Sequence, residues 1–293
     1  MDQTVVVQKL AFGLFVGSTY GVVAVGLTLI FGVMRVLNVG HGELLMLGGY
    51  VSYFAFTTLG VDPYLSVALS AITLFALGLV LNAVLFRYVE QLDEEQRIKN
   101  SLLISFGLAL VLQNVALFAF SADERSVRAA YAGGAFSVGG IILPYTRLLS
   151  FVVGTLAVAG LYVVLQRTYF GLAIRATAQD WEAAALAGIN IRRTYLLTFA
   201  IGSALAGIAG SLVLVTFSIS PAIGLAWTLK ALVVVVLAGM GSIYGAFLAG
   251  LLLGTVENLS TIWVGAEYQQ VVGLVLFLAV LLLRPRGLFT RRT

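Results

Sequence analysis

Long uncharged runs separated by short polar segments dominate this chain. Seven runs come close to the length of about 17–25 residues that an α-helix needs to cross a bilayer. They cover residues 10–34, 44–61, 63–86, 100–122, 148–166, 194–216 and 268–283. None alternates apolar and polar positions as a barrel strand does. The pattern therefore predicts membrane-spanning helices.

Composition supports the same conclusion. Hydrophobic residues make up 60% of the 293 positions, charged residues 10%, and the mean hydropathy is +1.04. We expect an all-α fold, a polytopic transmembrane helical bundle with broken or re-entrant helices, formed by residues 1–293 as a single domain. The chain has no cysteine, which excludes disulfides, thiolate nucleophiles and cysteine metal sites.

The length of the apolar stretch 227–259 does not by itself show how many times it crosses the membrane. Gly239, Gly241 and Gly245 divide this apolar stretch into two arms, and we expect each arm to be too short to cross alone. Cytoplasmic loops are normally enriched in Lys and Arg. That rule is met if the stretch returns to the side it entered from, as a broken or re-entrant helix pair, with the N-terminus outside. The cytoplasmic side then holds Arg35, Arg87, Arg97, Lys99, Arg167, Arg175, Arg192, Arg193, Arg284, Arg286, Arg291 and Arg292.

A polar break follows the first long run. Asn38, Gly40, His41, Gly42 and Glu43 lie between two apolar stretches. Irregular backbone at membrane depth is tolerated only where protein buries it or where it faces water. We expect a break beside a translocation path, where the polar side chains satisfy freed backbone groups or one another. Direct contact with a substrate is the alternative.

Two further features concern this break. Arg35 lies eight residues before Glu43, so the two could form an ion pair. The glycine-broken stretch near residue 240 echoes the break near residue 40. Transporters built from inverted repeats place their path at paired breaks, although shared membrane composition explains the echo equally well.

The sequence predicts two short elements outside the spans. "GAFSVGGIILPY" has two apolar arms around Gly139-Gly140, which is typical of a two-residue β-hairpin. Residues 179–187 form a short predicted helix, with Asp180 as its cap, Glu182 near its positive end and Gly188 as its terminator. A helix this short needs a packing surface. Either a partner protein or the chain's own bundle could supply it.

A family resemblance rests on three stretches. "EAAALAG", which begins at Glu182, matches the E-A-A-x-x-x-G motif of permease subunits of prokaryotic ABC importers. Its surroundings, "RATAQDWEAAALAGINIRRTYLLTFAIGSALAGIAGSLV", resemble branched-chain amino acid permeases of the LivH type, as do "GLTLIFGVMRVLNVGHGELLMLGGYV" and "ALVVVVLAGMGSIYGAFLAGLLLG". The general motif continues with Ile-x-Leu-Pro, whereas this chain has "TFAI" at 198–201.

The resemblance implies a permease that moves branched-chain amino acids, or related small amino acids and amides, inward across the prokaryotic plasma (inner) membrane. It also implies three kinds of protein partner: a second permease (LivM-type), two cytoplasmic ATP-binding subunits and an extracytoplasmic substrate-binding protein. The short helix would be the coupling helix that contacts an ATPase. Its contact residues would be Asp180, Glu182, Ala183, Ala184 and Gly188.

The sequence gives less support to other classes of function. ATP hydrolysis by this chain needs a P-loop, G-x-x-x-x-G-K-[S/T], but none of its three lysines follows a glycine. The metalloprotease motif H-E-x-x-H and the serine elbow G-x-S-x-G are absent from the sequence. We therefore expect no enzyme activity, cofactor or metal site, and the net charge of +4 gives no reason to expect nucleic acid. An ion-coupled secondary transporter remains the alternative, with His41, Glu43, Lys230 and Glu257 as its intramembrane ionisable groups.

Overall fold

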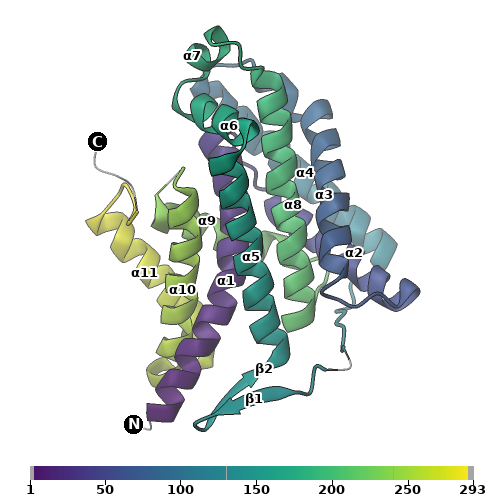
Figure 1. Ribbon diagram of the computed structural model, residues 1–293, viewed down its shortest axis with the longest axis vertical. Coiled ribbons are helices and arrows are strands. Elements are labelled where there is room, and N and C mark those ends of the chain that lie inside the picture. The colour runs from purple at the N-terminus through teal and green to yellow at the C-terminus, as the bar shows by residue number, and fades with distance from the viewer. Residues whose placement is uncertain (1–2, 130, 240, 290–293) are drawn as a thin grey trace.

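A computed structural model describes residues 3–129, 131–239 and 241–289 (Figure 1). Almost all of its regular structure is helical, as the sequence predicts. The helices are α1 (Gln3–Met34), α2 (His41–Leu59), α3 (Ser66–Val84), η1 (Phe86–Tyr88), α4 (Glu94–Phe120), α5 (Tyr145–Arg167), α6 (Tyr169–Gln179), α7 (Trp181–Leu186), α8 (Ile191–Thr216), α9 (Ile223–Ala238), α10 (Ile243–Val264), η2 (Ala266–Tyr268) and α11 (Gln269–Leu283).

Seven stretches in the described residues are long and apolar enough to cross a membrane: α1, α3, α4, α5, α8, α10, and α11 together with η2. Six of them match predicted spans. The remaining predicted span, residues 44–61, corresponds to α2. This segment is helical, but it carries His41 and Glu43 in its first turn. These two polar residues reduce its hydropathy, and α10 takes its place in the set.

Helix α1 runs through the bundle with α10 along one side and α8 along another (Figure 1). The α1–α10 contact depends on glycine. A Cβ atom on Gly17 would lie 2.7 Å from the carbonyl oxygen of Gly250, and one on Gly254 would lie 2.4 Å from the Cα of Gly17. The two backbones therefore touch directly. Small residues allow this close approach between helices in membranes, where van der Waals packing drives association.

The bundle has two distinct ends (Figure 1). Strands β1 (Ala135–Val138) and β2 (Ile141–Pro144) pair antiparallel near the start of α1, and Val138 faces Ile141 across the turn. Gly139 (φ 58°) and Gly140 (φ 83°) form that turn, so the predicted hairpin is confirmed. We call this end the hairpin face. The opposite end, the α7 face, carries α6 and α7.

The stretch 227–259 forms α9 and α10, which are separated by Gly239 (φ 95°) and Gly241 (φ 92°). Gly241 lies against Gly32, near the end of α1, while Thr255 of α10 lies against Gly13. Helix α10 thus runs back toward the hairpin face, and the stretch returns to the end it came from, as predicted. The prediction that both arms are too short is wrong for α10, because its 22 residues are enough to span a membrane.

The segment after α11 lies at the α7 face. The Leu288 amide donates to the carbonyl of Leu237 at 2.9 Å, and the Phe289 amide donates to that of Ala238 at 3.0 Å. Both acceptors belong to the end of α9, so this segment covers the carbonyls that α9 leaves free. Arg291 and Arg292, which the sequence analysis assigns to the cytoplasmic side, lie outside the described residues.

Candidate functional site

The break between α1 and α2 carries the chain back into the bundle. After α1 ends at Met34, residues 35–40 run without regular structure until α2 begins at His41. The Nε2 atom of His41 lies 3.2 Å from the carbonyl oxygen of Val23. Val23 precedes the end of α1 by eleven residues, or about 16 Å of helix. The first residue of α2 therefore lies deep inside the bundle.

Hydroxyl groups of α4 satisfy the unwound backbone. Ser101 Oγ accepts a hydrogen bond from the Leu37 amide at 3.0 Å. Ser105 Oγ accepts one from the Val39 amide at 3.0 Å and donates to the Leu37 carbonyl at 3.0 Å. Unpaired backbone groups are costly in hydrocarbon, and both serines are fully buried. Ser101 and Ser105 are four residues apart and share one face of α4, which is the signal that sequence reasoning missed.

Helix α9 supplies the third hydroxyl. Thr228 Oγ1 accepts from the Gly42 amide at 2.9 Å and donates to the Val39 carbonyl at 2.9 Å. The contact requires a glycine at position 42, because a Cβ there would lie 1.9 Å from the carbonyl oxygen of Gly224. Gly42 thus allows the start of α2 to approach α9 closely. The sequence alone does not predict the role of Thr228.

The polar side chains of the break make few hydrogen bonds among the described residues. Asn38, His41 and Glu43 are all buried, and the carbonyl that His41 contacts belongs to Val23, inside α1, and not to the break. Neither polar atom of the Asn38 side chain, nor Glu43 Oε2, has a hydrogen-bond partner among the described residues. The short hydroxyls of α4 and α9 occupy the backbone groups that these side chains were expected to satisfy.

The suggested Arg35–Glu43 pair does not form. Arg35 Nε lies 3.7 Å from Glu94 Oε1 at the start of α4, and both side chains are substantially exposed. Glu43 instead packs against α9, where a Cβ on Gly224 would lie 2.2 Å from its carboxylate. The two charges separate because the chain turns at Arg35 (φ 54°) and re-enters the bundle before it reaches Glu43.

The second predicted break lies at a different depth in the bundle from the break near His41. Gly239 and Gly241 lie at the α7 face, next to the end of α1, and not beside the His41 region. Gly245 does not break a helix. Its amide donates to Ser242 Oγ at 3.2 Å in the first turn of α10. The structure therefore does not bring the two breaks together.

The short predicted helix is confirmed as α7. Asp180 Oδ1 accepts a hydrogen bond from the Ala183 amide at 3.0 Å, Glu182 lies in the first turn, and Gly188 follows the helix with φ 86°. The bounds differ from the prediction because Gln179 ends a separate helix, α6. Asp180 has an extended backbone (φ −155°) that separates the two helices.

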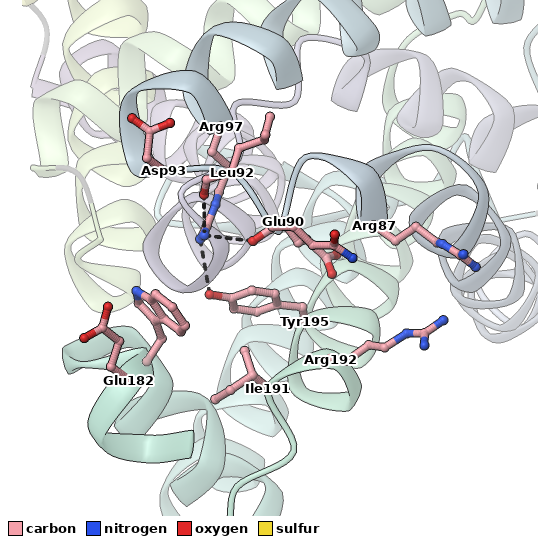
Figure 2. A pocket seen from close by; sticks show the side chains of 11 residues that line it. Arg87, Glu90, Leu92, Asp93, Arg97, Glu182, Ile191, Arg192 and Tyr195 are labelled. Carbon is pink, nitrogen blue, oxygen red and sulfur yellow. Dashed lines mark hydrogen bonds between the residues drawn. The ribbon is translucent and has the colours of Figure 1, made fainter. Parts of the chain in front are cut away.

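Helix α7 borders a cavity of about 630 Å³ at the α7 face, shown in Figure 2. On the opposite wall of the cavity, hydrogen bonds from Arg97 hold the Tyr195 side chain and the loop before α4 in place. The Arg97 guanidinium donates to the carbonyls of Glu90 and Leu92 at 2.8 and 3.0 Å, and to the Tyr195 hydroxyl at 3.3 Å. These bonds fix the loop before α4 against the start of α8. Further charged groups line the cavity: Arg87, Asp93, Glu182 and Arg192.

Burial raises the pKa of Glu90 above its ordinary value. A hydrogen bond from Asn82 (2.7 Å) and the positive charges of Arg97, Arg192 and Arg87 oppose that rise. The cavity wall therefore combines a partly desolvated carboxyl group with several arginines. Such a wall suits charged groups of a docking protein better than an apolar ligand.

Comparison with known proteins identifies the family. The family model for the permease component of branched-chain amino acid transport systems matches residues 9–281. The chain belongs to this family. The permease protein BraD of the high-affinity branched-chain amino acid transport system of Pseudomonas aeruginosa is 35% identical over 97% of this chain and 95% of its own length. LivH of Escherichia coli is 32% identical over the same shares. No solved structure matches the chain.

Membership in this family decides between the two transport mechanisms. The relatives are permease components of transport systems and not enzymes. The chain is accordingly a multi-pass permease component of an ABC importer in the prokaryotic plasma membrane, with seven apolar spans in its described residues. The ion-coupled alternative has no such support.

Proposed function

We propose that this chain forms one part of a path that carries branched-chain amino acids, or related small amino acids and amides, into the cell. Partner ATPases drive the transport through α7, a second permease of the LivM type completes the path, and a binding protein delivers the substrate at the hairpin face. The names of the relatives support the substrate class. A chain without a P-loop also needs ATPase partners.

The proposed coupling role rests on the length of α7 and on the exposure of its apolar side chains. This helix has six residues, and the side chains of Trp181 and Leu186 are 46% and 92% exposed. A helix so short is not stable on its own, yet Asp180 and Gly188 define both of its ends. A defined helix that presents apolar side chains at one end of a membrane bundle is suited to docking in a groove of another protein.

The break at residues 35–40 is the segment of the bundle where we propose that the backbone moves. Its backbone is held by hydroxyls from two different helices, α4 and α9. A shift of α7 acts on α8, the helix that follows it, and α8 packs against α1, α2 and α3. We propose that this chain of packed helices transmits the ATPase movement to the path.

Gly188→Val tests the coupling role. A Cβ at position 188 would meet no atom within 4 Å, so the substitution strains only the backbone at φ 86°. We expect normal assembly but loss of most ATP-dependent leucine uptake, measured per assembled complex, and a milder loss for Glu182→Lys. Gly160→Val is the matched control, because Gly160 also faces open space but lies inside α5. Wild-type uptake by Gly188→Val would remove α7 from the mechanism.

A further inference from the structure

A buried ion pair links α9 to α10. Lys230 Nζ donates a hydrogen bond to Glu257 Oε1 at 2.6 Å, and the Tyr20 hydroxyl donates to Glu257 Oε2 at 3.2 Å. The ammonium group also lies 5.2 Å from the centre of the Tyr20 ring. The Glu257 side chain is only 1% exposed, whereas that of Lys230 is 19% exposed.

Both residues lie well inside their helices. Glu257 is seven residues, or about 10 Å, from the end of α10, which is the nearer end. Lys230 is seven residues from the start of α9 and eight residues, or about 12 Å, from its end. Ionisable groups at such depth are rare and usually functional. Stability alone is a weak reason to keep them, because apolar replacement of a complete buried pair is often neutral or stabilising.

Two adjoining cavities connect the pair with the hairpin face. The first, of about 380 Å³, is lined by Lys230, Trp227 and Leu274, and the second, of about 350 Å³, reaches Arg147 and Glu267. Arg147 lies in the first turn of α5 next to β2, and Glu267 lies in η2 between α10 and α11. The two cavities share four lining residues: Tyr20, Phe217, Glu257 and Gln270.

We propose that these cavities form a binding site for a zwitterionic amino acid on its way through the permease. The α-carboxylate binds Lys230, the α-ammonium binds Glu257, and an aliphatic side chain packs against Trp227 and Phe217. This assignment rests on the proposed function for its substrate class. It adds the residues of this chain that recognise the substrate inside the membrane.

The charge arrangement fits this ligand. Lys230 has three N–H donors, and its bond to Glu257 uses one. A zwitterion beside the pair produces an alternating square of four charges, so that no charge is left unpaired in the low-dielectric interior. A purely anionic or cationic ligand would leave one excess charge there. Arg147 and Glu267 offer the same combination of charges at the opening.

The shape also fits. The first cavity has the size of small-molecule sites, which occupy about 300–1,000 Å³ and combine apolar walls with a few polar groups. The rings of Tyr20 and Trp227 lie 5.7 Å apart, and those of Phe217 and Trp227 lie 6.2 Å apart. These three rings form an apolar wall next to the ion pair, which suits a branched aliphatic side chain.

Thiol protection tests the site directly, because the chain has no cysteine of its own. Gln270→Cys places a thiol in both cavities, and Ser137→Cys on the hairpin serves as the control. The complete transporter in vesicles is treated from the hairpin face with a cationic methanethiosulfonate. Leucine at ten times its dissociation constant should slow labelling of Gln270→Cys about tenfold by occupancy, and leave Ser137→Cys unaffected. Absence of labelling, or labelling that leucine does not slow, would overturn the assignment.

A paired substitution separates recognition from folding. Lys230→Met with Glu257→Gln removes both charges together, so no lone charge remains buried, and Gln keeps an acceptor for Tyr20. The same double change at the exposed Lys99–Glu95 pair of α4 is the control. We expect the first variant to assemble but to lose leucine protection of Gln270→Cys, and the control to keep it. If the Lys230–Glu257 variant assembles and keeps full protection, the pair does not bind substrate.

Uptake in the same vesicles distinguishes the two proposals. If the wild-type complex accumulates leucine with ATP but leucine never protects Gln270→Cys, the site assignment fails and the proposed function stands. If the complex accumulates no branched-chain amino acid and no related small amino acid or amide, the proposed function fails, and the site assignment fails with it.

Discussion

At the scale of single residues, three hydroxyl groups explain how an unwound segment is tolerated inside this bundle. Ser101, Ser105 and Thr228 accept hydrogen bonds from the amides of Leu37, Val39 and Gly42. Ser105 and Thr228 also donate to carbonyls of the same segment. Hydrocarbon offers no hydrogen bonds in exchange. The hydroxyls therefore determine where the irregular backbone can lie.

Thr228→Val measures this contribution. The change keeps the side-chain shape but leaves the Gly42 amide and the Val39 carbonyl buried without a partner, at a cost of about 1–3 kcal/mol each. We expect a clear loss of thermal stability of the purified protein in detergent. Thr57→Val is the control, because its exposed hydroxyl only donates within α2, to the Tyr53 carbonyl at 2.9 Å. Equal effects of the two changes would show that Thr228 does not hold the break.

The sequence predicts features that depend on neighbouring residues, but it does not predict contacts between residues far apart in the chain. Asp180 as a cap, Gly188 as a terminator and the Gly139-Gly140 turn each follow from the residue and its immediate neighbours. Thr228 reaches the break from 186 positions away from Gly42. Nothing near Gly42 indicates which hydroxyl will face it, so the sequence predicts the break but not what holds it.

At the scale of elements, the loop between η1 and α4 supports the start of α8 and the cavity beside α7. Arg97 holds this loop through the carbonyls of Glu90 and Leu92. The sequence predicts only a cytoplasmic connection here. It also predicts that Gln179 belongs to α7, since the extended backbone of Asp180 that separates α6 from α7 leaves no clear signal in a run of good helix formers.

Glu90→Gln should reveal the cost of burying this carboxyl. The raised pKa means that the folded protein disfavours the charged form. That cost is absent below the unfolded pKa, near 4.5, and complete above the folded pKa. We expect the variant to melt at a higher temperature than wild type at about pH 8, and at the same temperature at about pH 4. Gln keeps an acceptor oxygen for Asn82.

The control for this experiment is Glu95→Gln, because the side chain of Glu95 is 75% exposed in α4. It should not change the melting temperature at about pH 8. A Glu90→Gln variant that is less stable than wild type at about pH 8 would show that the arginines around Glu90 outweigh its desolvation.

At the scale of the whole molecule, the two ends of the bundle have different chemistry. Ten basic residues of the described chain belong to the α7 face: Arg35, Arg87, Arg97, Lys99, Arg167, Arg175, Arg192, Arg193, Arg284 and Arg286. The hairpin face has four: Lys9, Arg125, Arg128 and Arg147. The positive-inside rule then predicts a cytoplasmic α7 face. Hydrophobic runs were sufficient to predict most spans. They were not sufficient for α10, because glycines at its start resemble a break although the helix continues through Gly245.

Single-cysteine labelling tests this orientation. In cells that produce the permease without its ATPases, Leu186→Cys in α7 and Pro285→Cys after α11 should react with an impermeant thiol reagent only after the cells are opened. Ser137→Cys in β1 should react in intact cells. All three positions are exposed in the structure. Labelling of Pro285→Cys and Ser137→Cys from the same side would contradict the return of α9 and α10 to the hairpin face.

Dependence on partner ATPases is what most clearly separates this permease from an ion-coupled transporter. The most direct measurement is leucine accumulation in vesicles that contain the permease with its second permease, ATPases and binding protein, compared with vesicles that lack only the ATPases. We expect leucine accumulation that needs both ATP and the ATPases, and that a proton or sodium gradient cannot drive in their place. Leucine accumulation driven by such a gradient in the vesicles without ATPases would contradict this dependence.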